Sequence, residues 1–287
     1  MKPYFFMIGY GFSQTIVWIL VSYLSQSVTV TVMFLARNLV GFVLTFLFAP
    51  SKRIPLASFK RWKTHLVRAS ATLLGGLSIF YSVTKIPVAD SVAITFLAPI
   101  FGTLLSIIYL KEKLTGATLV KLAAGFAGVL IITGFSADGD TIGYAAALFG
   151  AFMTGVAYVS VKSLSDTESP QNILYISYLV MLPISALLAT DEWATPSYTE
   201  LFWLLAIGTA FYLAQIFMAK AFSLAPAAKV LPVDYSRMIF SSILGLLFLD
   251  QSMTLSTYIG AALILFTSIL REKDIEKLSY RRIFKRS

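Results

Sequence analysis

Cysteine is absent from this chain of 287 residues, and histidine occurs once, as His65. Without cysteine the chain has no disulfide framework, no thiolate nucleophile and no cysteine ligand for a metal. A single histidine cannot form a polyhistidine metal site, and we interpret His65 as an interfacial residue rather than a proton relay. A glycine-rich phosphate-binding loop is also missing, which argues against ATP hydrolysis by this chain.

Charged residues are also scarce in this chain, and apolar residues are abundant. Charged residues make up 13% of the chain and hydrophobic residues 57%, and the mean hydropathy is +0.80. A soluble domain carries about 25% charged residues. A chain this apolar is better described as a series of bilayer-length segments, each needing about 20 residues to cross ~30 Å of hydrocarbon. The composition therefore predicts an integral membrane protein.

The apolar runs and the charges between them predict ten membrane-spanning segments. These must be helices, because a lone strand cannot satisfy its backbone in lipid. Pro99 and Pro183 lie inside two of the segments, where either proline can bend or break its helix. The first segment is too long for a signal-peptide core, so we expect it to be retained. We place the segments near residues 4–24, 28–49, 65–84, 89–110, 115–134, 141–162, 171–190, 199–222, 228–249 and 254–270.

The charged residues alternate in sign from one set of loops to the other. Basic residues gather in the loop after the second segment, after the fourth and sixth segments, and in the tail 271–287; they include Lys52, Arg53, Lys60, Arg61, Lys63, Lys111, Lys113, Lys162 and Arg271. The other loops hold Asp138, Asp140, Asp191, Glu192, Glu200 and Asp250. This is the positive-inside pattern. It predicts that both termini and the basic tail are cytoplasmic, and it explains the net charge of +9 without a nucleic-acid partner.

The chain also repeats itself at a separation of 139 residues. Pro87 corresponds to Pro226, Leu110 to Leu249 and Thr115 to Thr254, with an apolar run and a polar turn between them in both copies. Five segments per copy is an odd number, so the two copies would insert in opposite orientations. We therefore expect an all-α fold of two inverted five-helix repeats, residues 1–134 and 141–270. Such repeats place a solute site between them, near the bilayer midplane.

Three ionisable residues at membrane depth are the first candidates for this site, because charge in a membrane is expensive. Asp234 and Arg237 lie three apart on one helical face. They are either an intrahelical pair that locks helix packing or part of the cavity wall, and both roles can coexist. Arg37 lies half-way along the second segment, where it faces the cavity or pairs with Asp234 or a backbone carbonyl.

Polar and aromatic residues at similar depth are further candidates. Trp18 lies inside the first segment and falls near Tyr158 in the register of the repeat, while Tyr235 sits between the two charged residues of the ninth segment. A buried tyrosine hydroxyl needs a partner, and a polar cavity supplies one. For each residue, ordinary packing stays the alternative. The full set is Gln14, Trp18, Tyr81, Tyr158, Tyr212, Gln215 and Tyr235.

Three stretches and one single residue carry a resemblance to a known family. They are Ile86–Ser91, Leu97–Phe101, Tyr109–Thr115 and the basic residue Arg37. In them the chain resembles the drug/metabolite transporter superfamily, in particular its ten-helix EamA-type branch. Asp250 and Gln251 depart from the pattern, standing where the family often has Gly-Glu. The resemblance implies a secondary carrier that works by alternating access, with no bound cofactor and no enzymatic activity.

The expected solute is a small organic metabolite. Basic groups outnumber acidic ones at membrane depth, which suits an amino acid, another zwitterion or an organic anion. The tyrosines could also stack on the ring of a nucleoside-like or vitamin-like metabolite. A passive pore and a lipid-handling membrane protein are weaker alternatives. We expect a monomer or homodimer in contact with membrane lipids, located in the bacterial cytoplasmic (inner) membrane.

The predicted orientation can be tested directly on this cysteine-free chain. A single cysteine introduced at Asp138 should react with a membrane-impermeant thiol reagent added outside intact cells, whereas one at Lys60 should react only after the cytoplasmic side is opened. Labelling of the Asp138→Cys variant from the cytoplasmic side alone would reverse the orientation.

Overall fold

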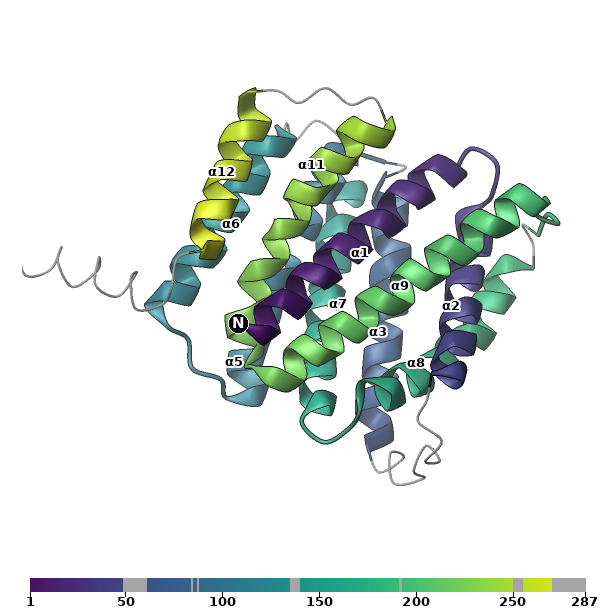
Figure 1. The fold of residues 1–287 in the computed structure, drawn as a ribbon, viewed down its shortest axis with the longest axis horizontal. Coiled ribbons are helices and arrows are strands. Elements are labelled where there is room, and N and C mark those ends of the chain that lie inside the picture. Colours follow the sequence, from purple (N-terminus) through teal and green to yellow (C-terminus); the bar gives the residue numbers. More distant parts are fainter. Residues whose placement is uncertain are drawn as a thin grey trace, which may run out of the picture.

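The computed structural model of the chain describes residues 1–48, 61–83, 85–86, 88–134, 140–190, 193–249 and 255–269, and every regular element in them is helical (Figure 1). Apart from one 3-10 segment, η2 (Leu231–Tyr235), all are α-helices. They are α1 (Lys2–Leu24), α2 (Val30–Leu47), α3 (Trp62–Val83), α4 (Val88–Thr95), α5 (Ala98–Leu110), α6 (Gly116–Thr133), α7 (Thr141–Ser165), α8 (Pro170–Ala189), α9 (Tyr198–Leu224), α10 (Ala227–Val230), α11 (Ser236–Leu249) and α12 (Leu255–Ile269).

The helices occupy the ranges that the sequence predicts. Within the described residues, seven spans are long and apolar enough to cross a membrane, and α6 is apolar but shorter. The all-helical membrane fold is thus confirmed, whereas the count of ten crossings stays a prediction. The basic loop after α2, apart from Arg61 and Lys63, and the tail from Arg271 lie outside the described residues, as do Asp138, Asp191 and Asp250.

Two of the predicted segments are broken in the middle. The fourth divides into α4 and α5 just before Pro99, because proline has no N–H to donate and its ring clashes with the preceding turn. The ninth divides into α10, η2 and α11, and Pro232 stands near the start of η2. This second break was not predicted from the sequence. Pro183, in contrast, lies inside the continuous helix α8.

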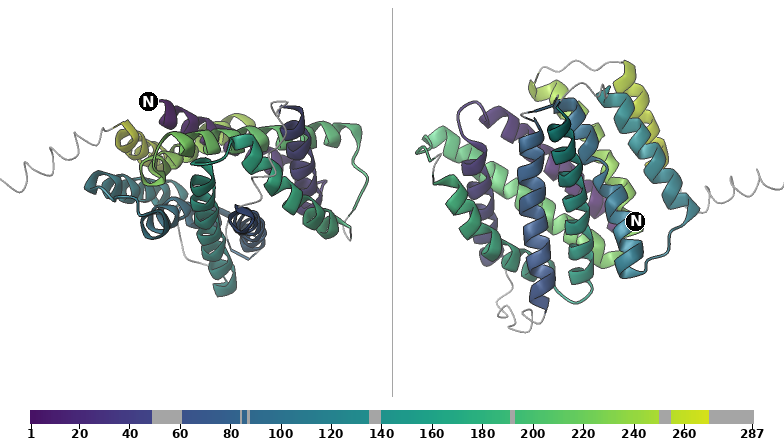
Figure 2. Two further views of the ribbon diagram at one scale, coloured as in Figure 1. Left: turned by 90° about the horizontal axis from the view of Figure 1, so that it is seen from below. Right: turned by 180° about the vertical axis from the view of Figure 1, so that it is seen from behind.

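The long helices form two layers. Helices α1 and α9 pack against each other on one side of the molecule, and α3 and α7 pack against each other on the opposite side (Figures 1 and 2). The pair α2 and α8 lies at one end, and the pair α6 and α12 at the other (Figure 1). Each pair joins a helix from before residue 134 to one from after residue 141. The middle of the molecule therefore lies between α1 and α9 on one side and α3 and α7 on the other.

Small residues allow the closest of these approaches. A Cβ atom added to Gly260 of α12 would lie 2.5 Å from the carbonyl oxygen of Gly128 in α6, so any larger side chain would push the two helices apart. Small-xxx-small spacing is typical of close helix contacts in membranes. Gly128 therefore serves packing within this chain.

One carboxylate ties the two parts of the chain together at a turn. Helix α5 ends at Lys111, whose φ of 55° reverses the backbone. The next residue, Glu112, accepts hydrogen bonds from the backbone N–H groups of Ala227 at 2.8 Å and Ala228 at 2.9 Å. These N–H groups begin α10 and have no partner within the helix. Glu112 is thus a structural link from the α5–α6 turn to the ninth segment.

Replacing Glu112 by alanine should destabilise the protein. The change leaves two N–H groups at the start of α10 without their charged acceptor, at a cost of about 1–3 kcal/mol. Thermal unfolding of the purified protein in detergent should show a lower Tm. The matched control is Asp166→Asn, because Asp166 is 55% exposed in its pair with Lys162, and such surface pairs contribute only about 0–1 kcal/mol. An equal Tm for the two variants would contradict the role of Glu112.

Candidate functional site

A cavity lies in the middle of the molecule, and both layers of helices contribute to its wall. Its polar lining comes from α1, α2, α3 and α4 before residue 134 and from α7, α9 and α11 after residue 141. No aspartate or glutamate of the described residues is among the lining side chains. The polar lining residues are Tyr10, Gln14, Arg37, Arg68, Thr72, Thr95, Thr154, Tyr158, Gln215 and Arg237.

A second, smaller cavity shares part of its lining with the first. The two share Gln14, Trp18, Arg37 and Phe80, and the second extends to Val21, Val30 and Ile207. Val21 lies near the end of α1 and Val30 begins α2. The second cavity therefore lies between the central cavity and the edge at which α1 turns into α2.

Six of the ten residues predicted from the sequence line the central cavity. They come from five different helices, so only the tertiary fold brings them together. They are Gln14 and Trp18 of α1, Arg37 of α2, Tyr158 of α7, Gln215 of α9 and Arg237 of α11.

The charged residues of the ninth segment form a buried pair. Arg237 Nη2 lies 3.5 Å from Asp234 Oδ2, and the Tyr158 hydroxyl donates to the same oxygen at 3.1 Å. The hydroxyls of Tyr158 and Tyr10 are in turn 3.0 Å apart. Asp234 is fully buried and does not line the cavity, whereas Arg237 does. The pair therefore links η2 to the first turn of α11, and Arg237 also presents its guanidinium group to the cavity.

Arg37 is held by aromatic rings. Its guanidinium carbon lies 3.8 Å from the centroid of the Phe34 ring and 4.1 Å from that of Phe211, so it makes cation–π contacts with both rings. Its Nε and Nη2 atoms are buried and have no hydrogen-bond partner. Among the ion pairs formed by the described residues, none includes Arg37. The expected alternatives, a pairing with Asp234 or a backbone carbonyl, are therefore not what the structure shows.

Arg68 of α3 was missed by the sequence analysis. It is 3% exposed, and it donates through Nη2 to Gln215 Oε1 at 3.1 Å and through Nη1 to the Ser177 hydroxyl. Both acceptors are neutral. Arg68 lies near the start of the third predicted segment, close to the basic loop, and no role was assigned to it from the sequence. Its spacing from Thr72 and Ile79, four and eleven residues later, could have placed it on the same face of α3.

The remaining four predicted residues do not line the cavity. Besides Asp234, these are three tyrosines, each of which points away from it. Tyr235 is fully buried and stacks on Phe96 at a centroid distance of 6.0 Å, and Tyr212 lies in the apolar core between α2, α8 and α9. Tyr81 is 45% exposed. Phe80 and Phe211, the neighbours of Tyr81 and Tyr212, line the cavity instead, because adjacent helical residues point about 100° apart.

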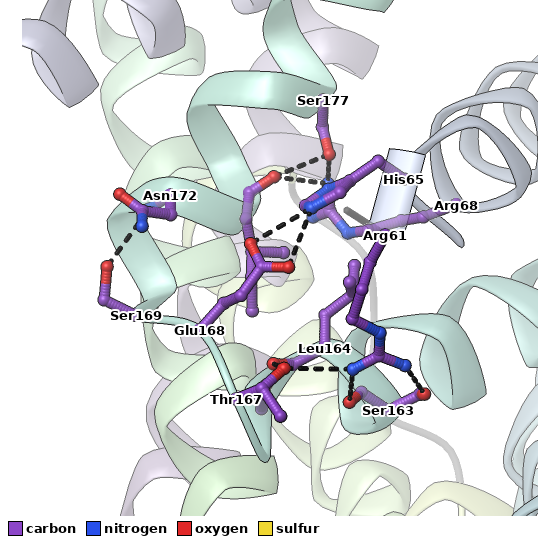
Figure 3. A network of polar contacts seen from close by, with 12 residues as sticks. Arg61, His65, Arg68, Ser163, Leu164, Thr167, Glu168, Ser169, Asn172 and Ser177 are labelled. Atoms are coloured by element: carbon purple, nitrogen blue, oxygen red, sulfur yellow. Dashed lines mark hydrogen bonds and ion pairs between the residues drawn. The ribbon is translucent and has the colours of Figure 1, made fainter. Parts of the chain in front are cut away.

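A polar network joins α3 to the end of α7 and the turn before α8 (Figure 3). Arg61 Nη1 donates to the Ser163 carbonyl oxygen at 2.6 Å and to the Thr167 hydroxyl at 3.0 Å. His65 Nε2 lies 3.0 Å from a carboxylate oxygen of Glu168. Burial raises the pKa of the Glu168 carboxyl, and nearby Arg61 partly offsets this. His65, expected at the membrane interface, is thus fully buried in a bridge between elements from the two parts of the chain.

Comparison with known proteins identifies the class. The model of the EamA-like transporter family matches residues 1–134 and again residues 141–270. The riboflavin transporter of Rhizobium johnstonii is 31% identical over 80% of this chain and 77% of its own length. The S-adenosylmethionine uptake transporter of Rickettsia conorii is 26% identical over 71% of this chain and 70% of its own. A protein of known crystal structure shares the fold, with a TM-score of 0.74 over 96% of this chain and 97% of its own, at 18% identity.

The chain therefore belongs to the EamA-like transporter family, within the drug/metabolite transporter superfamily. This confirms the resemblance carried by the motifs around Pro87, Pro99 and Glu112. The protein is an integral membrane transporter and not an enzyme.

The buried pair of the ninth segment should behave as a coupled unit. Asp234→Asn and Arg237→Gln each leave one charge buried without its partner, which costs about 3–5 kcal/mol. The double variant should recover most of that loss, so its destabilisation should be much smaller than the sum of the two single losses in a double-mutant cycle. Thermal unfolding of the four proteins measures it, with the exposed pair Lys162 and Asp166 as the control cycle. Additive effects at Asp234 and Arg237 would show that the pair is not a structural unit.

Proposed function

We propose that the protein is a secondary active carrier that moves a small organic metabolite across the membrane by alternating access. The observation that carries this proposal is the composition of the cavity wall. Gln14, Arg37 and Arg68 come from the first part of the chain, and Tyr158, Gln215 and Arg237 from the second. A solute bound there contacts both parts, so a movement of one part against the other can change the side from which the solute is reached.

The packing of the helices supports two inverted five-helix repeats, residues 1–134 and 141–270. The first helix of each repeat packs on the third helix of the other, as α1 does on α9 and α7 on α3. The second helices, α2 and α8, pack on each other, as do the last, α6 and α12. Exchanging the two repeats leaves this set of contacts unchanged, as a two-fold axis requires.

The broken helices support the same axis. The 139-residue register that aligns Pro87 with Pro226 also aligns Phe96 with Tyr235, since 96 plus 139 is 235. The helix breaks occur at these two residues, and their rings stack at 22° between planes. Residues that contact their own counterparts lie beside a two-fold axis. Broken helices facing each other near the midplane are typical of solute sites in carriers with inverted repeats.

The structure corresponds, in this proposal, to a state closed on the cytoplasmic side. The second cavity extends toward the edge where α1 turns into α2, while the bridge of Arg61, His65 and Glu168 joins the two repeats at the opposite edge. The charge distribution of the loops assigns that edge to the cytoplasm. Opening to the cytoplasm then requires α3 to separate from the turn between α7 and α8.

The expected solute range is an amino acid, another zwitterion or an organic anion, with a vitamin-like metabolite as the second candidate. The arginines of the cavity favour the first range. The rings of Trp18, Phe80 and Phe211 on the wall, together with relatives named as riboflavin transporters, favour the second. Riboflavin is therefore the first solute to test for uptake into vesicles that contain the purified protein.

Locking the cytoplasmic bridge should stop transport. Cysteines introduced at Arg61 and Thr167 can be joined by a short, reducible bifunctional thiol reagent, because the native side chains meet at 3.0 Å. The joined protein should still bind its solute from the open side but lose counterflow, and reduction should restore it. The two single-cysteine variants treated in the same way are the controls. Full counterflow in the joined protein would argue for a static pore and against alternating access.

A further inference from the structure

We propose that the solute is a planar organic anion, and that Arg37 and Arg68 bind its carboxylate or phosphate group. This rests on the proposed carrier function and names its substrate class. Four observations carry it: the charge balance of the cavity, the unpaired donors of the two arginines, their contacts with residues on neighbouring turns of α9, and the rings beside them.

The charge balance of the cavity is positive. Three arginines line it, and among the described residues the only carboxylate in contact with any of them is that of Asp234, which faces Arg237. Among the described residues no acidic side chain opposes Arg37 or Arg68. Two positive charges are therefore left without a counter-charge at membrane depth, where a charge is costly unless it is paired. A bound anion is the partner that would compensate them.

The two arginines also retain free donors. Arg37 Nε and Nη2 and Arg68 Nε are buried without hydrogen-bond partners. Phe34 and Phe211 lie within cation–π distance of the Arg37 guanidinium carbon, and the unpaired Nε and Nη2 atoms lie on one edge of this planar group. An edge of that kind matches the two oxygens of a carboxylate or phosphate in a bidentate contact.

The two guanidinium groups occupy neighbouring positions along α9. Arg37 stacks on Phe211, and Arg68 bonds to Gln215. Residues four apart lie on the same face of a helix, separated by one turn or roughly 6 Å along its axis. One anionic group placed beside this turn of α9 can reach both arginines.

Aromatic rings define the rest of the ligand. Trp18 and Phe80 line the cavity with ring centroids 6.0 Å apart, and Phe211 lies beside Arg37. Such walls suit a planar ring. An ammonium group finds no carboxylate on the wall, because Asp234 lies behind it, bonded to Tyr158 and Arg237. The lining thus favours an anion over a zwitterion.

The test compares probes that share a ring system and differ in whether they carry an anionic group. Indole-3-acetate and its neutral amide form one pair, and riboflavin 5′-phosphate and riboflavin form the other, with tryptophan as the zwitterion. Binding to the purified wild-type protein is measured by ligand-induced thermal stabilisation. We expect the anion of at least one pair to bind roughly 10- to 100-fold more tightly than its neutral partner, as charge-assisted hydrogen bonds predict.

Variants then assign the preference to the two arginines. Arg37→Gln and Arg68→Gln should each reduce the preference for the anion about tenfold or more, and Arg37→Lys should restore it only in part, because an ammonium lacks the planar fork. Lys113→Gln is the control: it removes a positive charge from an exposed side chain outside the cavity and should leave the preference unchanged. Should a cavity variant fail to fold, the wild-type probe pairs still decide the question.

Several outcomes would overturn the inference. Equal binding of both members of each pair, tighter binding of tryptophan, or no stabilisation by either anion would each contradict it. A preference that persists unchanged in folded Arg37→Gln and Arg68→Gln proteins would place the anion elsewhere. Uptake of riboflavin without any preference for its phosphate would contradict this inference but would not contradict the proposed carrier function. Anion binding that depends on the arginines, with no counterflow of the bound probe, would instead contradict the carrier.

Discussion

The cost of placing charge inside a membrane is the constraint on which this structure depends. Three arginines lie in the middle of the molecule, and each is accommodated in a different way. Arg237 is balanced by Asp234, Arg68 is solvated by the neutral oxygens of Gln215 and Ser177, and Arg37 is enclosed by two phenyl rings. Only the first of these arrangements neutralises the charge. The other two hold it in position without a counter-charge, which is costly inside a membrane and makes these two arginines candidates for ligand binding.

The same constraint explains why the site lies between two halves. Each half alone would expose its charged face to lipid, whereas together they enclose it. Helices α1 and α9 cover one side of the cavity and α3 and α7 the other, so every wall needs a helix from each part of the chain (Figure 2). The contacts that close the edges, Glu112 with α10 and Arg61 with Ser163, also run between the parts. Binding and closure therefore depend on the same relative placement of the halves.

Several features could be predicted from the sequence because their causes are local. The mean hydropathy requires membrane helices, since only backbone groups paired within the segment are tolerated in lipid. Pro99 interrupts its helix for a reason that lies in one residue. Arg37 and Arg237 could be selected as cavity residues, since a charge at membrane depth calls for a function wherever the fold places it.

The composition and the position of each charge along its segment thus determined the helical membrane fold and most of the charged candidates, and the motifs around Pro87, Pro99 and Glu112 indicated the family. The tertiary structure alone decided which face of each helix meets the cavity. Tyr81 and Tyr212 were predicted as lining residues, yet their neighbours Phe80 and Phe211 hold those positions. Arg68 joined the site although its neighbours in the sequence mark a membrane edge. The reason is physical: helices that are apolar all round carry almost no amphipathic signal, so their rotation is set by contacts with other helices, and those contacts exist only after the halves have packed.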